Sequence, residues 1–247
     1  MPNWCDNSGQ IKGDKATLDE IWNIIHQGTN ESDGHDARPA LTALRPCPDD
    51  LVNTTAGFLS ESSDGYAEWK AKQEANKAKY GYTDWYGWCV DNWGTKWTPD
   101  FEFERHDGYI SFSGQTAWSP PEELMRYISE KYPVLIEMSY SEEGMFFIGC
   151  SIFEKGETYC SSAEPTAQWN DDFSNDDEYY EALDNDRNFH ERIAYEYYTH
   201  GRAVSRENEI LLGRDILPRM GEASVTTTLT GEVVVSMDAP TDSEDTK

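Results

Sequence analysis

Apolar and polar residues alternate most regularly in the segment FEFERHDGYISFSG, which begins at residue 101. The two alternating runs on either side of Asp107-Gly108 predict a β-hairpin with a two-residue type I′ turn. In that register Phe103 faces Phe112 and Arg105 faces Ile110, so the apolar side chains share one face. A second hairpin is predicted around the sequence SEEG. Its two strands carry apolar residues on both faces and therefore need cover on both sides.

Other segments repeat their apolar residues at the spacing of a helix rather than a strand. This pattern predicts helices in residues 17–25, 64–81, 83–94 and 119–133. Thr17, Thr83 and Ser119 are the expected N-caps, and Glu20 completes a capping box with the first of them. A strand is also predicted between Trp4 and Lys12, before the first helix.

The order of these elements predicts the fold class. Without a helical insertion at about residues 41–98, it reads β-α-β-β-α-β, the split βαβ or ferredoxin-like order, followed by an extra strand. We therefore expect an α+β protein with a ferredoxin-like antiparallel sheet and helices on one face of it.

The composition becomes more acidic and richer in tyrosine near residue 160, which suggests a division of the chain into two parts at this point. We expect a ferredoxin-like domain in residues 1–160, then an acidic helical extension with a short β-hairpin in residues 161–237. Residues 238–247, APTDSEDTK with the preceding Asp, read as a disordered tail.

The net charge of −27, with 47 Asp and Glu against 20 Lys and Arg, narrows the choice of partner. Affinity for nucleic acid comes mainly from cationic side chains, so direct binding to nucleic acid is disfavoured. An anionic membrane surface is disfavoured for the same reason. A host protein with a basic surface is the partner that this charge favours, and the oligomeric state is left open.

Motifs for catalysis and cofactor binding are missing from the linear sequence. The five cysteines form no C-x-x-C pair, and no P-loop, G-x-S-x-G or H-E-x-x-H occurs. We therefore expect no metal, no cofactor, no catalytic residue and no enzyme activity. The opening sequence has no signal-peptide pattern, so the expected location is the cytoplasm of a bacterial cell.

The segment YGWCVDNWGTKW is the most aromatic part of the chain. Trp85, Trp88 and Cys89 share one helical face, while Trp93 and Trp97 flank a glycine turn. We expect most of this cluster to be core, with acidic or amide neighbours accepting hydrogen bonds from the indole groups. The alternative is a site for a small molecule or peptide at Trp93 and Trp97. A less favoured alternative is an RNA-stacking surface, for which Lys96 and Arg105 are nearly the only nearby cations.

Acidic residues concentrate in the predicted extension, where tyrosines and other apolar residues also follow a helical stripe. A solvated helix face explains such a pattern, and so does a surface that imitates the charge of a nucleic acid. The residues expected to form the second kind of surface are Asp171, Asp172, Asp176, Asp177, Glu178, Glu181, Asp184 and Asp186.

Several of these motifs occur together in one known family. The start MPNWCDN, the YGW and NWGTKW block, and the strand leading into TAWSPP resemble the YubB ferredoxin-like family of phage and plasmid proteins, over roughly residues 1–155. The resemblance implies a ferredoxin-like core and an origin in phages or other mobile elements. It implies no catalytic activity and no iron–sulfur cluster.

Together these observations lead to a functional hypothesis. We expect a phage or mobile-element accessory protein that is not an enzyme. It would inhibit a host nucleic-acid-handling or defence protein by occupying that protein's basic surface, as a mimic of nucleic acid.

Overall fold

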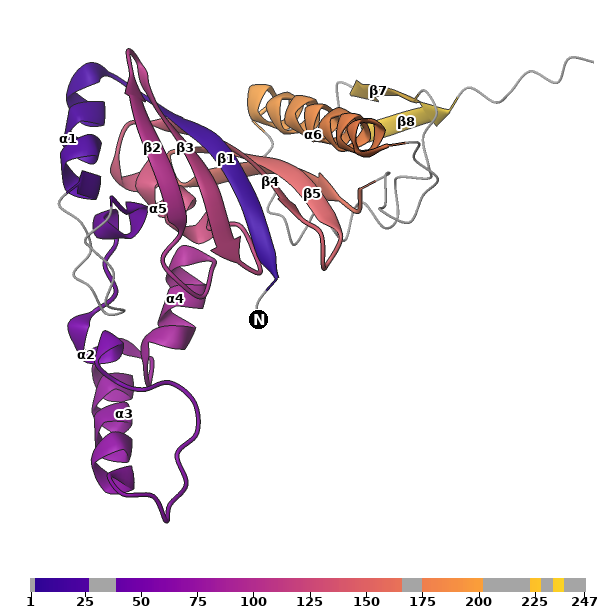
Figure 1. Cartoon of the computed structure of the whole chain (residues 1–247). Helices are drawn as coiled ribbons and strands as arrows, with labels where there is room; N and C mark the ends of the chain where they lie inside the picture. Colours follow the sequence, from indigo (N-terminus) through magenta and orange to yellow (C-terminus); the bar gives the residue numbers. More distant parts are fainter. Residues whose placement is uncertain (1–2, 27–38, 166–174, 202–222, 228–232, 238–247) are drawn as a thin grey trace, which may run out of the picture.

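The computed structural model describes residues 3–26, 39–165, 175–201, 223–227 and 233–237 (Figure 1). A six-stranded antiparallel sheet forms the centre of the molecule, and helices lie on both of its faces. The elements in chain order are β1 (Trp4–Lys12), α1 (Lys15–His26), η1 (Leu41–Leu44), α2 (Asp49–Val52), α3 (Tyr66–Tyr80), α4 (Trp85–Trp93), β2 (Asp100–His106), β3 (Tyr109–Ala117), α5 (Glu122–Lys131), β4 (Leu135–Glu142), β5 (Phe147–Glu154), β6 (Glu157–Ala163), α6 (Asp176–Thr199), β7 (Ala223–Thr227) and β8 (Val233–Met237).

The strand order is β2-β3-β1-β4-β5-β6, and all neighbours are antiparallel. The first four of these strands, with α1 and α5 as crossovers, form the β-α-β-β-α-β unit of a ferredoxin-like fold. This confirms the predicted fold class. Strands β5 and β6 then extend the sheet by two strands, one more than the sequence pattern predicted.

The β2–β3 hairpin has the predicted register, with Phe103 opposite Phe112 and Arg105 opposite Ile110. Its two-residue turn, however, is not type I′, because only Gly108 has a positive φ, 86°. A negative φ followed by a positive one is the sign pattern of a type II turn. Two consecutive positive φ angles, as type I′ requires, occur instead at Lys155 and Gly156 between β5 and β6.

One face of the sheet carries the main hydrophobic core. Helices α1 and α5 lie against it, and their buried residues include Leu18, Ile21, Leu124 and Ile128. The strands contribute every second residue of β1, β3 and β4, which is the spacing that one face of a strand requires.

The opposite face is covered only in part, by α6. This helix contacts β5 and β6, where Cys150, Ile152 and Ala194 form a second, smaller buried cluster. The expectation that the second hairpin is covered on both sides is therefore confirmed for β5, whereas Glu137 of β4 lines an open groove. The expectation of helices on one face holds for α1 and α5 but not for α6, which packs on the sheet as a second layer.

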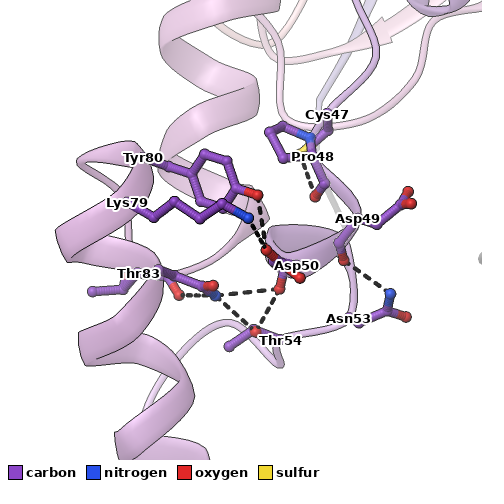
Figure 2. Close-up of polar contacts among 10 residues, drawn as sticks. Cys47, Pro48, Asp49, Asp50, Asn53, Thr54, Lys79, Tyr80 and Thr83 are labelled. Atoms are coloured by element: carbon purple, nitrogen blue, oxygen red, sulfur yellow. Dashed lines mark hydrogen bonds and ion pairs between the residues drawn. The ribbon is translucent and has the colours of Figure 1, made fainter.

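The insertion between α1 and β2 contains η1, α2, α3 and α4. Figure 1 shows α2 and α3 standing away from the sheet. Asn76 of α3 is buried and donates hydrogen bonds to the Asp50 and Thr83 carbonyls and to Thr54 Oγ1, at 2.9–3.2 Å. Lys79 and Tyr80 both point to the Asp50 carboxylate, each at 2.8 Å (Figure 2). These contacts hold α2 against α3 in a part of the chain with few buried apolar residues.

The helix starts differ from the predicted caps. Asp14, rather than Thr17, accepts hydrogen bonds from the N–H groups of α1, and Asp84, rather than Thr83, accepts from the Tyr86 N–H of α4. Ser119 donates to the Gly94 carbonyl, and α5 begins at Glu122. In both helices the hydroxyl predicted as the cap instead donates to the capping carboxylate, Thr17 Oγ1 to Asp14 at 2.7 Å and Thr83 Oγ1 to Asp84 at 2.9 Å. A charged acceptor makes the stronger hydrogen bond.

The predicted domain boundary at residue 160 falls inside β6, so the sheet continues to Ala163 before the chain reaches α6. Strands β7 and β8 pair with each other, as the predicted short hairpin requires. The predicted tail at residues 238–247 lies outside the described residues. No helix in the described ranges is both long and apolar enough to span a bilayer.

Candidate functional site

An open groove crosses the half of the sheet that α6 leaves uncovered. Its floor is the outer face of β1 and β3, where Ser8, Gln10, Ser111 and Ser113 replace the apolar residues of the inner face. Small hydroxyl side chains leave the backbone close to the surface and offer donors and acceptors to a polar ligand. The groove has a volume of about 590 Å³, which lies in the range usual for ligand sites.

Carboxylates line the two long sides of this floor. Glu102 and Glu104 come from β2, while Glu137 comes from β4 and Glu191 from α6. Three strand spacings of about 4.8 Å separate β2 from β4, so the two acidic sides lie about 14 Å apart. We call this arrangement the acidic groove.

The α6 side of the acidic groove is tightly hydrogen-bonded. Glu137 accepts hydrogen bonds from Lys12 Nζ at 2.6 Å and from the Tyr195 hydroxyl. Glu191 Oε1 accepts one from Ser139 Oγ at 2.7 Å. Burial, together with the hydrogen bond to Glu137, raises the pKa of Tyr195. Tyr195 therefore stays neutral and donates a hydrogen bond to the Glu137 carboxylate.

On the β2 side, fewer of the described cations and hydrogen-bond donors offset the negative charge of the glutamates. His106 Nε2 lies 3.4 Å from Glu104 Oε2, and the Glu104 side chain is largely exposed. Arg105 of the same strand points to the other face and pairs with Asp19 of α1 at 3.1 Å. Because strand residues alternate between faces, the one Arg of β2 contributes no charge to the groove floor.

The cysteine at the edge of the acidic groove is not activated as a nucleophile. Burial raises the pKa of the Cys150 thiol to about 12, so this cysteine stays protonated near neutral pH. In the part of the chain that the structure describes, no three His, Cys, Asp or Glu side chains are placed to hold a metal ion. The chemistry that the groove offers is hydrogen bonding and the attraction of cations.

Helix α6 carries the acidic residues that the sequence singled out. Asp177, Glu178, Glu181 and Asp184 are exposed, and Asp184 forms an ion pair with Arg187. Asp186 is half-buried on the side of His190. Asp176 is the first residue of α6, while Asp171 and Asp172 lie outside the described residues. Of the described members of the predicted surface, Asp177, Glu178 and Glu181 are thus exposed, as is Asp184, whose charge Arg187 offsets.

Buried residues fix the orientation of α6 on the sheet. Tyr179, His190 and Ala194 are each at most 6% exposed. His190 Nδ1 lies 2.7 Å from Ser161 Oγ of β6, and burial lowers the pKa of His190 to about 4. A neutral histidine at this position allows the helix to pack closely, so its acids are presented at fixed places.

The aromatic segment divides into core and surface. Trp93 and Cys89 are buried, and Trp85 and Trp88 are half-buried against the same core. The Trp93 indole donates to the Arg45 carbonyl at 2.9 Å, not to the acidic or amide neighbours that we expected. Trp97 is 38% exposed and its ring centroid lies 6.1 Å from that of Trp4. Most of the cluster is core, as predicted, but Trp97 is not.

The groove carboxylates were missed in the sequence because they are spread from residue 102 to residue 191. A local signal existed for two of them, since the alternation in FEFE places Glu102 and Glu104 on the face opposite the phenylalanines. Nothing local indicated that Glu137 and Glu191 would join them, because α6 had no predicted position relative to the sheet.

Comparisons with known proteins place this region in context. A family model described as "Ferredoxin-like domain in Api92-like protein" matches residues 92–191, from the end of α4 into α6. A search of curated proteins gave no match. The crystal structure of a protein api92 from Yersinia pseudotuberculosis aligns with 68% of this chain and 99% of its own, at 12% sequence identity and a TM-score of 0.42. The segment that the family model matches includes β2–β6 and the groove carboxylates.

Proposed function

We propose that this protein is a non-enzymatic accessory protein of a phage or other mobile element. It binds the basic surface of a bacterial protein that handles nucleic acid or takes part in defence, and thereby blocks that surface. It does so in the cytoplasm of the host cell. Its resemblance to phage and plasmid proteins supports the origin, and its charge of −27 supports the kind of target.

The observation that carries this proposal is the fixed presentation of carboxylates by α6 and the adjoining acidic groove. Buried contacts hold α6 in one orientation, with Asp177, Glu178 and Glu181 outward. Charges that are held in place lose little conformational entropy on binding, which favours affinity. A net charge of this size also steers a cationic partner toward the protein.

Proteins that grip nucleic acid are the target class because they carry grooves lined by Lys and Arg. An acidic partner that enters such a groove competes with the phosphates. Direct RNA binding by this chain has less support, since the open sheet face carries Ser and Glu where stacking domains of this fold have aromatic residues.

A second candidate function is recognition of a peptide or small molecule by exposed aromatic residues. The exposure of Trp97 beside Trp4 favours it, whereas Trp93 is buried and takes no part. In that case the overall charge would keep the protein in solution but would not determine which partner it binds.

The main test is capture of proteins from a bacterial lysate at low and high salt by two variants of equal charge. One combines Asp177→Lys, Glu178→Lys and Glu181→Lys on α6. The matched control combines Glu61→Lys, Asp64→Lys and Glu74→Lys, which are exposed residues in or near α3. We expect the α6 variant to lose a basic protein that the wild type and the control both retain at low salt, because exposed charges act over about 8–10 Å.

Equal loss in both variants would show that only the net charge matters. Capture of the basic protein by both charge variants would contradict the proposal. If both charge variants capture it and only Trp97→Ala loses it, the second candidate is favoured.

A further inference from the structure

Five large apolar side chains are exposed at one end of the sheet. They are Trp4, Trp97, Trp118, Met145 and Phe146, which are 38–69% exposed. We call this surface the apolar end. Apolar side chains scattered singly over a surface are normal, but a group of them marks an interaction site.

The register of the strands joins these residues into one surface. Trp4 begins β1 between Ala117 of β3 and the end of β4, and the Trp118 N–H donates to the Asn3 carbonyl at 2.9 Å. The β4–β5 turn contacts Asn3 through Gly144, and Trp97 lies against Trp4. The apolar end therefore includes the starts of β1 and β2 and the ends of β3 and β4.

Backbone strain coincides with this surface. Among the described non-glycine residues, Trp118, Phe146 and Lys155 have a positive φ, and the first two belong to the apolar end, with φ of 73° and 54°. Such conformations cost energy for bulky residues and are frequent at functional sites. The buried Glu142 carboxylate maintains the turn by accepting hydrogen bonds from the Gly144 and Met145 N–H groups.

The rings of the apolar end already contact a cation. Lys96 Nζ lies 4.4 Å from the Trp97 ring centroid and 5.0 Å from that of Trp118. This geometry is that of a cation–π interaction, to which an arginine or lysine of a partner can add. Trp and Tyr are also among the residues that contribute most to binding at protein interfaces.

The exposed acids of α6 lie toward the same end of the sheet. Tyr195 contacts Glu137 and Glu191 contacts Ser139, while Arg187 shares a small pocket with Ser141. The helix residue number thus falls by four each time the strand residue number rises by two. Four residues of a helix and two of a strand each advance about 6 Å, so these contacts are regularly spaced and α6 runs antiparallel to β4. Residues 177–184 therefore continue toward the β4–β5 turn, where Met145 and Phe146 are exposed.

We propose that the apolar end is the docking centre for a partner protein whose own apolar patch is edged by Lys and Arg. The partner's apolar patch covers Trp4, Met145 and Phe146, and its cations meet the acids of α6 and the open ring faces. Charge complementarity selects this occupant over a second copy of the chain, because two copies would bring like charges together at the rim. This inference rests on the proposed function and adds to it the place where the partner is anchored.

The test uses a defined probe, a fluorescently labelled helical peptide with leucines on one face and arginines on both flanks. A twin peptide with glutamates replacing the arginines controls for charge. Binding is measured by fluorescence anisotropy for the wild type, Trp4→Thr and Phe146→Asn. The control is Phe58→Asn, because Phe58 is 90% exposed but belongs to the insertion. Asparagine tolerates a positive φ, so Phe146→Asn retains the turn.

We expect the arginine peptide to bind and the glutamate peptide not to bind. Trp4→Thr and Phe146→Asn each weaken binding at least tenfold, and Phe58→Asn leaves it within twofold. Thermal melts that match the wild type show that the variants are folded.

Each other outcome overturns the inference. The outcomes also distinguish a failure of this inference from a failure of the proposed function. If the peptide does not bind, or binds Trp4→Thr and Phe146→Asn as tightly as the wild type, the apolar end is not the docking centre. Loss of basic-protein capture in the α6 charge reversal would then still support the proposed function. Concentration-dependent dimers in analytical ultracentrifugation that disappear in Phe146→Asn would identify a second copy as the occupant.

Discussion

The two faces of the sheet differ in what covers them. The inner face carries α1 and α5 and contains nearly the whole hydrophobic core, from Cys5 to Phe153. The outer face has a buried cluster of three residues under α6, and beside it an open floor of serines edged by glutamates. Neighbouring residues of β3 show the contrast, because Phe112 is 3% exposed whereas Ser113 is exposed.

This difference shows how the chain divides two tasks between the faces of one sheet. Burial of apolar area on the inner face supplies most of the stability, since it is the dominant favourable term in folding. The outer face then needs few apolar residues of its own, so it can hold the acids that our proposal assigns to binding. If that division is right, substitutions on the two faces will have very different effects.

The largest effect is expected on the inner face, for Phe112→Ala. The Phe112 ring is buried and stacks on Phe101 at a centroid distance of 5.3 Å. Its removal leaves a cavity, so we expect the free energy of unfolding to fall by about 3–5 kcal/mol. Urea denaturation with an unchanged m-value measures this loss. Phe112→Leu, which fills most of the space, should cost less, and equal costs for the two variants would contradict a packing role.

An intermediate effect is expected beneath α6, from the protonation of His190. Its pKa is about 4 in the folded protein, against 6.5 for an ordinary histidine. Between these values the unfolded chain binds the proton and the folded protein does not, so stability is lost as the pH falls from 6.5 toward 4. The full difference corresponds to about 3 kcal/mol.

Urea denaturation of wild type and His190→Gln over this pH range isolates that contribution, because the carboxylates titrate in both proteins. We expect the stability of the wild type to fall more steeply than that of the variant. His200→Gln, at the exposed end of α6, should behave as the wild type does. Parallel curves for wild type and His190→Gln would mean that His190 is not held neutral under α6.

The smallest effect is expected on the open floor, for Ser113→Ala. This side chain is exposed and packs against no core residue, so the free energy of unfolding should change by less than about 0.5 kcal/mol. The same urea titration as for Phe112→Ala provides the measurement. A loss above about 1 kcal/mol would show that the outer face also contributes to stability and would weaken the contrast between the faces.

The sequence by itself determined the parts of this fold that depend on local patterns. Alternation around Asp107-Gly108 fixed the register of Phe103 and Phe112, because a shift by one residue would turn every apolar side chain outward. The order of elements determined the ferredoxin-like topology, since short connections and right-handed crossovers leave few alternatives. The apolar residues on both sides of β5 showed that the outer face needed a cover.

Only the tertiary structure decided which residues share a surface. Helical spacing places Trp93 on a face with its neighbours. It does not determine that Trp93 is buried and Trp97 exposed, because their burial depends on where η1 and β1 lie. Strand β6 escaped prediction because its sequence, ETYCSSA, has little apolar alternation, and its neighbour β5 supplies the pairing. The acidic groove joins Glu102 to Glu191 across 89 residues, and the apolar end joins Trp4 to Phe146. Such contacts arise from the packing of whole elements, and no short stretch of sequence specifies them.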